Sequence, residues 1–205
     1  MKKIILSFIF LIAAQLFSAQ GDTNYEKTLK DFMLFKKNVK IDPKNKSVLN
    51  VLNAMYDETL QSDAGILSDR TAKEYDRLLN ESNVPNQQVL YLYKKYQTYI
   101  AENSVNGKKP DAEYQLNLVK LLAGESIYSL DNLPKIVAVF MAESLISSGN
   151  YEAAKNNIDL SLKRYPDSIP LNVYKYYLNK ENNIKLKEKL LKEHPNHWMV
   201  QSFVR

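Results

Sequence analysis

Few residues in this chain have the types and the spacing that catalysis or metal binding requires. The 205 residues include no cysteine and two histidines, His194 and His197. The lack of cysteine excludes thiol nucleophiles and thiolate metal sites. The two histidines form a His-x-x-His pair, which could suit zinc or copper, but Pro195 lies between them and Glu193 is the only neighbouring carboxylate. We therefore predict that both histidines are turn residues and that the protein holds no metal and no cofactor.

The motifs of common catalytic and phosphate-binding sites are also missing. A Ser/His/Asp triad would have to recruit one of the two histidines, and the G-x-S-x-G sequence of the α/β-hydrolases does not occur. No glycine-rich phosphate loop is present either. Glu143 is the carboxylate that stands out, because it lies among Phe140, Ala142 and Ile146 in an apolar stretch. The sequence favours a protein that is not an enzyme, with a hydrolase kept as an alternative.

The elements that carry these residues are helices, and the clearest two lie in residues 134–168. The first begins at Pro134, a residue favoured at helix starts, and has apolar residues three and four positions apart. Gly149 and Asn150 then form a turn, because glycine reaches positive φ without steric cost. The second helix ends before Pro166, since proline cannot continue a helix. Two short helices joined by a tight turn predict an αα-hairpin.

This hairpin resembles a tetratricopeptide repeat (TPR). Gly149, Tyr151, Ala154 and Pro166 have the mutual spacing of the turn glycine, aromatic residue, alanine and terminal proline of that 34-residue family repeat. Ala154 is small enough to let the two helices approach closely, and Tyr151 is placed to wedge between them. The first half departs from the family pattern, so the unit is a divergent repeat.

The rest of the chain shows the same helical period and no clear strand alternation. Residues 169–195 resemble a second repeat, shortened to 29 residues between Pro166 and Pro195, with a polar turn at residues 179–183. The other helical patterns cover residues 24–39, 47–60, 69–80, 87–101, 110–124 and 198–204. The sequence predicts an all-α fold, a TPR-like solenoid of αα-hairpins with about nine or ten helices, in one domain of residues 20–205.

The first residues have the pattern of an export signal. Lys2 and Lys3 precede an apolar run at residues 4–17, and a small-residue cleavage site follows at Ala19. We predict a signal peptide at residues 1–19 and a protein that is periplasmic or secreted. A transmembrane anchor is the alternative, although the run is short for one. After cleavage we expect no stable membrane insertion.

The charge pattern argues against a nucleic-acid partner. The formal net charge of +5 falls to about +3 when Lys2 and Lys3 are removed, and acidic residues are interleaved with the lysines throughout. Without disulfides, the exported chain depends on core packing for its stability.

The TPR resemblance implies a ligand groove lined by the first helix of each hairpin. The matching offsets in this chain select eight candidate residues: Leu92, Tyr96, Tyr99, Val139, Glu143, Ile146, Val173 and Tyr177. Tyrosine offers an apolar face together with a hydroxyl, but these tyrosines could equally pack between helices. We predict a non-catalytic protein-interaction module, a scaffold or adaptor that binds a protein or peptide in this groove. A glycan-binding accessory protein of the cell envelope is the alternative, supported by the 14 tyrosines.

Overall fold

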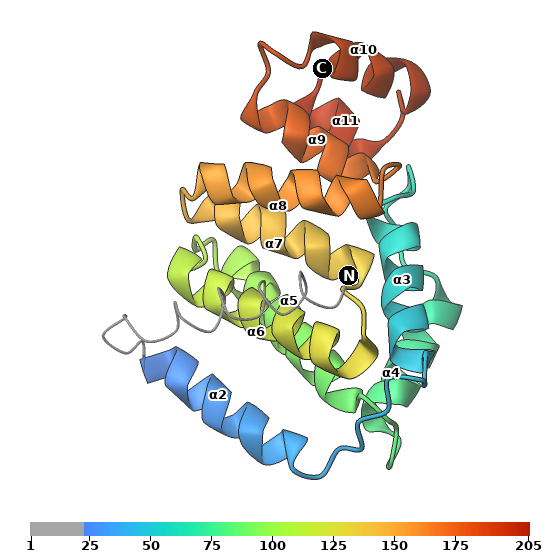
Figure 1. Cartoon of the computed structure of the whole chain (residues 1–205), viewed down its shortest axis with the longest axis vertical. Helices are drawn as coiled ribbons and strands as arrows, with labels where there is room; N and C mark the ends of the chain where they lie inside the picture. Colours follow the sequence, from blue (N-terminus) through green and yellow to red (C-terminus); the bar gives the residue numbers. More distant parts are fainter. Residues whose placement is uncertain (1–22) are drawn as a thin grey trace.

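The computed structural model describes residues 23–205, and Figure 1 shows this part as a stack of helices. These residues contain ten helices and no strand, so the predicted all-α class is confirmed. The helices are α2 (Thr23–Lys36), α3 (Ser47–Thr59), α4 (Asp69–Asn80), α5 (Gln87–Val105), α6 (Ala112–Leu130), α7 (Lys135–Ser147), α8 (Tyr151–Arg164), α9 (Ile169–Leu178), α10 (Ile184–Glu193) and α11 (Trp198–Phe203). Within residues 23–205, none of them combines the length and the apolar character that crossing a membrane requires. The predicted signal peptide, residues 1–19, lies outside the described residues and stays a prediction.

The hairpin predicted in residues 134–168 is formed by α7 and α8, which pack side by side (Figure 1). α7 begins directly after Pro134. Gly149 lies in the turn with a φ of +76°, which glycine adopts without strain. Ala154 is fully buried, as expected for the close approach of two helices, but Tyr151 is 54% exposed. The tyrosine therefore does not wedge between the helices, because as the first residue of α8 it lies at the exposed turn.

α7 is the most enclosed helix of the stack. Nine of its thirteen residues are buried, on every side of the helix, because α3, α6, α8 and α9 all pack against it. Its apolar side chains form one core with those of α3, α5 and α6. A helix in this position has little free surface on which to bind a ligand.

Contacts between α3 and the C-terminal half go beyond the pattern of a simple solenoid. In a solenoid each repeat contacts only its neighbours along the chain. Here α3 packs on α7, and Gln61, just after α3, donates a hydrogen bond of 2.9 Å from its Nε2 to the carbonyl oxygen of Asp167. α3 therefore supports α7 and the loop before α9 from the side (Figure 1).

α6 is longer than its sequence pattern predicts. The pattern weakens at Gly124, yet the helix continues for more than another turn. Glu125 is buried in this part and joins three helices, because Oε2 accepts from Lys36 Nζ of α2 at 2.7 Å and Oε1 accepts from Gln88 Nε2 of α5 at 3.1 Å. Bonds of this kind to a charged group outweigh the cost of about 1 kcal/mol for a glycine inside a helix.

The last three helices form a second, smaller core. α9, α10 and α11 bury a separate set of apolar side chains: Ile169, Val173, Tyr176, Leu190, Met199, Val200 and Val204. Pro166 lies in the loop between α8 and α9, where the sequence predicts the end of the first repeat. The two predicted hairpins thus meet at residues 165–168.

Candidate functional site

Half of the predicted groove residues are part of the core. Leu92, Tyr96, Val139 and Val173 are each at most 2% exposed. The ring of Tyr96 stacks on Phe140 of α7, with ring centroids 4.7 Å apart. Helical spacing identified the inward face correctly, but the protein's own helices fill the space in front of it. These four residues stabilise the fold and do not offer a surface to a ligand.

The other predicted groove residues lie at separate places. The hydroxyl of Tyr99 accepts a hydrogen bond of 2.6 Å from the backbone N–H of Asp111, next to the start of α6. Tyr177 is 45% exposed and packs edge-on against Phe203 of α11. Ile146 is half-buried against the main core. The structure therefore does not bring the predicted set together as one groove.

Glu143 lies in a tight environment between helices. Burial raises the pKa of its carboxyl group. The pKa of the Tyr174 hydroxyl is raised first by burial and then by the charge of Glu143. The pKa of Tyr96 rises to about 12, first by burial and then by the same carboxylate. No described residue forms an ion pair or a hydrogen bond with Glu143. We therefore expect this enclosed carboxylate to lower the stability of the fold at neutral pH.

Of the two histidines, His197 has a structural role, because its side chain caps the start of α11. His197 is fully buried, its Nδ1 accepts from the backbone N–H of Met199 at 3.3 Å, and its Nε2 lies 2.9 Å from the carbonyl oxygen of Leu60. Both ring nitrogens are therefore used inside the protein. Among residues 23–205 no three histidine or acidic side chains are grouped so that they could hold a metal ion.

The surface with the shape of a binding site lies elsewhere, along the two C-terminal hairpins. Four adjoining hollows run from α8 across α9 and α10 to the end of α3, with volumes of about 150, 460, 260 and 250 Å³. Each hollow shares lining residues with the next. The shared residues are Lys175 and Asn183, then Asn172 and Leu186, then Gln61, Pro166 and Asp167. We call this continuous surface the C-terminal groove.

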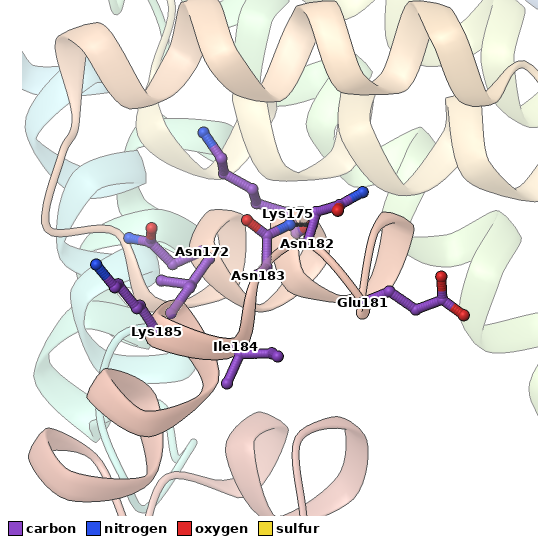
Figure 2. A pocket seen from close by; sticks show the side chains of 8 residues that line it. Asn172, Lys175, Glu181, Asn182, Asn183, Ile184 and Lys185 are labelled. Carbon is purple, nitrogen blue, oxygen red and sulfur yellow. Dashed lines mark hydrogen bonds between the residues drawn. The ribbon is translucent and has the colours of Figure 1, made fainter.

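The hollow with the largest of these four volumes, which we call the widest hollow, lies between α9 and α10, and Figure 2 shows its polar side chains. The NH₂ group of Asn172 donates to the carbonyl oxygens of Pro166 and Ser168 at 3.0 and 2.9 Å. The NH₂ group of Asn183 donates to the carbonyl oxygens of Lys175 and Asn179 at 3.3 and 2.8 Å. These bonds hold both amides in fixed positions. They also tie the α9–α10 turn and the loop before α9 to the body of α9.

Ion pairs position several charged side chains along the groove. Lys175 Nζ of α9 lies 2.8 Å from Asp159 Oδ1 of α8, and Lys189 Nζ lies 3.8 Å from Glu193 Oε2 within α10. Lys185 at the widest hollow has no ion pair or hydrogen bond with any described residue. Figure 2 shows the side chain of Glu181 extending away from Lys185 and Asn172. The hollow between α9 and α10 thus combines fixed amides with two charged side chains, Lys185 and Glu181, that have no partner among the described residues.

The sequence did not reveal this groove. Residues 179–183 are recognisable as a polar turn, and a run with asparagine at three of five positions is the one feature that could have drawn attention to it. The groove also needs Gln61, more than a hundred residues earlier in the chain. No helical period indicates that such distant segments meet.

Comparison with known proteins gives no match, whether to a family model, a curated protein or a solved structure.

Proposed function

We propose that the protein is a non-catalytic protein-interaction module that binds a protein or peptide partner in the C-terminal groove. In this proposal the α7–α8 and α9–α10 hairpins are divergent TPR-like units of a short helical array. The protein acts as a scaffold or adaptor after export to the periplasm or the cell exterior.

The observation that supports this function most is the shape of the groove. Four hollows follow one another in a row and share residues such as Asn172 and Asn183. A small molecule fills one enclosed pocket, whereas a row of open hollows suits an extended chain that contacts each in turn. A peptide segment is the ligand with that shape.

The groove residues also favour binding over chemistry. Asn172 and Asn183 use their NH₂ groups to fix the backbone. The histidine at the groove, His194, neighbours Glu193, which is paired with Lys189. Catalysis needs a nucleophile, a base and an orienting group in contact with one another. The described residues of the groove contain no such set of contacting groups. A surface fixed in advance loses little entropy when a partner binds.

A pull-down from an envelope extract tests this function. The purified protein is compared with Asn182→Trp, which places a bulky ring at the widest hollow, and with Asn156→Trp on the exposed side of α8, outside the groove. We expect the parent and Asn156→Trp to retain the same partner proteins. Asn182→Trp should lose them.

Two results would contradict the proposal. Equal retention by all three proteins places the binding surface elsewhere. If no protein is retained by the parent, an oligosaccharide array tests the glycan-binding alternative, for which bound sugars lost in Asn182→Trp are the positive result.

A further inference from the structure

The positive charge of the protein is concentrated beside the C-terminal groove. Residues 169–205 contain seven lysine and arginine residues and three glutamates, whereas residues 23–168 contain nineteen basic and nineteen acidic residues. The excess cations therefore belong to the segment that forms α9, α10 and α11. Within the Debye length of about 8 Å at physiological salt, such an excess attracts negative charge.

At the widest hollow this excess is available to a ligand. Lys185 has no partner among the described residues, and Glu181, the one carboxylate that lines this hollow, extends away from it (Figure 2). The ion pair of Lys175 with Asp159 is between exposed side chains, and exposed pairs contribute only about 0 to 1 kcal/mol. A ligand carboxylate could therefore bind Lys185 directly and compete for Lys175 at little cost.

The amides of the same hollow need a different group from the ligand. The NH₂ groups of Asn172 and Asn183 are committed to backbone carbonyls, and no described residue donates to either side-chain oxygen. These oxygens can only accept hydrogen bonds, so a ligand that binds them directly must donate. An extended peptide carries one N–H group at each non-proline residue.

The two requirements together select one class of ligand. Phosphate groups would satisfy the ammonium group of Lys185 but offer no donor to Asn172 and Asn183. A neutral sugar would supply hydroxyl donors but no negative charge. Building on the proposed function, we infer that the C-terminal groove binds an extended, acidic segment of a partner protein, whose backbone N–H groups donate to Asn172 and Asn183 and whose carboxylate pairs with Lys185.

Selection from a random peptide library tests the partner class. A phage library of twelve-residue peptides is panned on the immobilised protein, and the winning peptides are synthesised with a fluorescent label. We expect the selected sequences to be enriched in aspartate and glutamate. Lys185→Glu should weaken their binding about tenfold, whereas Lys94→Glu, the same charge change at an exposed site on α5, should not.

A second comparison isolates the backbone contacts. The same peptide with N-methyl groups at alternate residues keeps its carboxylates but loses half of its N–H donors. We expect it to bind at least fivefold more weakly than the parent peptide. Equal binding of the two peptides would overturn the assignment of Asn172 and Asn183.

Other outcomes would overturn the inference about the partner class but would not contradict the proposed function. Selected peptides that are basic, neutral or absent, or that bind equally to Lys185→Glu, would show that the partner is not an acidic segment. The envelope pull-down would still decide whether the groove binds a protein. If that pull-down yields a groove-dependent partner that the acidic peptide does not displace, the function stands and the partner class is wrong.

Discussion

The hydroxyl group of Tyr56 lies 2.7 Å from Ser168 Oγ, in a buried hydrogen bond that joins residues 112 positions apart. Tyr56 belongs to α3, and Ser168 caps the start of α9. Gln61 completes the junction, because its Oε1 accepts from the Tyr56 hydroxyl at 2.7 Å and from the backbone N–H of Ile169 at 3.0 Å. The N-terminal half of the fold therefore fixes one end of the C-terminal groove.

Removal of the Tyr56 hydroxyl should destabilise the protein. Tyr56→Phe leaves Ser168 and Gln61 each without one partner at a buried junction, so we expect the free energy of unfolding to fall by about 1 to 2 kcal/mol. Urea denaturation followed by circular dichroism measures this change. Tyr128→Phe is the control, because Tyr128 is 62% exposed, and it should change stability by less than about 0.5 kcal/mol. Equal stability of the two variants would show that the junction does not stabilise the fold.

Replacement of Glu143 should have the opposite effect. The carboxylate is largely enclosed and unpaired among the described residues, and burial raises its pKa from the ordinary 4.5. Glu143→Gln removes a charge that folding must desolvate, so we expect a gain of the order of 1 kcal/mol at neutral pH. Glu152→Gln, at an exposed position on α8, is the control and should bring no gain. Urea midpoints of the three proteins give the comparison.

The pH dependence of the same variant tests the cause. The native state holds the Glu143 proton more tightly than the unfolded state does, so the stability of the parent should fall as the pH rises above 4.5 toward the raised pKa. The advantage of Glu143→Gln should therefore be small near pH 4 and grow toward pH 7. If the stability gain of Glu143→Gln over the parent stays constant over this pH range, the gain comes from packing and not from charge.

The sequence predicted the helices well because their periodicity is local. The hairpin of residues 134–168 appears as α7 and α8, with Gly149 in the turn, since the turn conformation depends on glycine itself. The same periodicity could not show which helix would cover which face. Val139 and Tyr96 are predicted to line a groove, but the neighbouring helices bury both side chains. For Val139 on α7, the covering helices are α3, α6, α8 and α9.

The candidate site was harder to predict than the fold. The C-terminal groove brings Gln61 together with Asp167 and Asn172, and no pattern within either segment refers to the other. The helix extension past Gly124 has a similar cause. Propensity alone weakens the helix there, whereas the bonds of Glu125 to Lys36 and Gln88 come from two other helices.

Truncation of His197 should separate the C-terminal helix from the rest of the fold. The buried ring bonds to Met199 of α11 and to Leu60 after α3, so His197→Ala loses two hydrogen bonds and leaves a cavity. We expect a loss of about 2 to 4 kcal/mol in the free energy of unfolding. His194→Ala, at a half-buried position in the groove, should cost less than about 1 kcal/mol. Similar losses in both variants would contradict the special role of His197.

His197 should also make stability fall in mild acid. Burial lowers its pKa from the ordinary 6.5, an effect that exceeds the opposing influences of the Leu60 carbonyl and of Asp63. The unfolded state then binds the proton first, so the free energy of unfolding should decrease as the pH falls through 6.5 toward the lower native pKa. Urea midpoints at several pH values above and below 6.5 test this. A His197→Ala variant that keeps the parent's slope in this range would assign the slope to another group.

Two glycines should respond in opposite directions to the same substitution. A Cβ atom at Gly124 or at Gly149 would meet nothing within 4 Å, so the backbone conformation alone decides the result. Gly124 lies inside α6, where alanine is favoured, and Gly124→Ala should stabilise the protein by about 0.5 to 1 kcal/mol. Gly149 has a φ of +76°, which strains an L-residue, so Gly149→Ala should destabilise it by about 1 kcal/mol. Thermal melting beside the parent should show a higher midpoint for Gly124→Ala and a lower midpoint for Gly149→Ala. A shift of both midpoints in the same direction would contradict the positive-φ turn between α7 and α8.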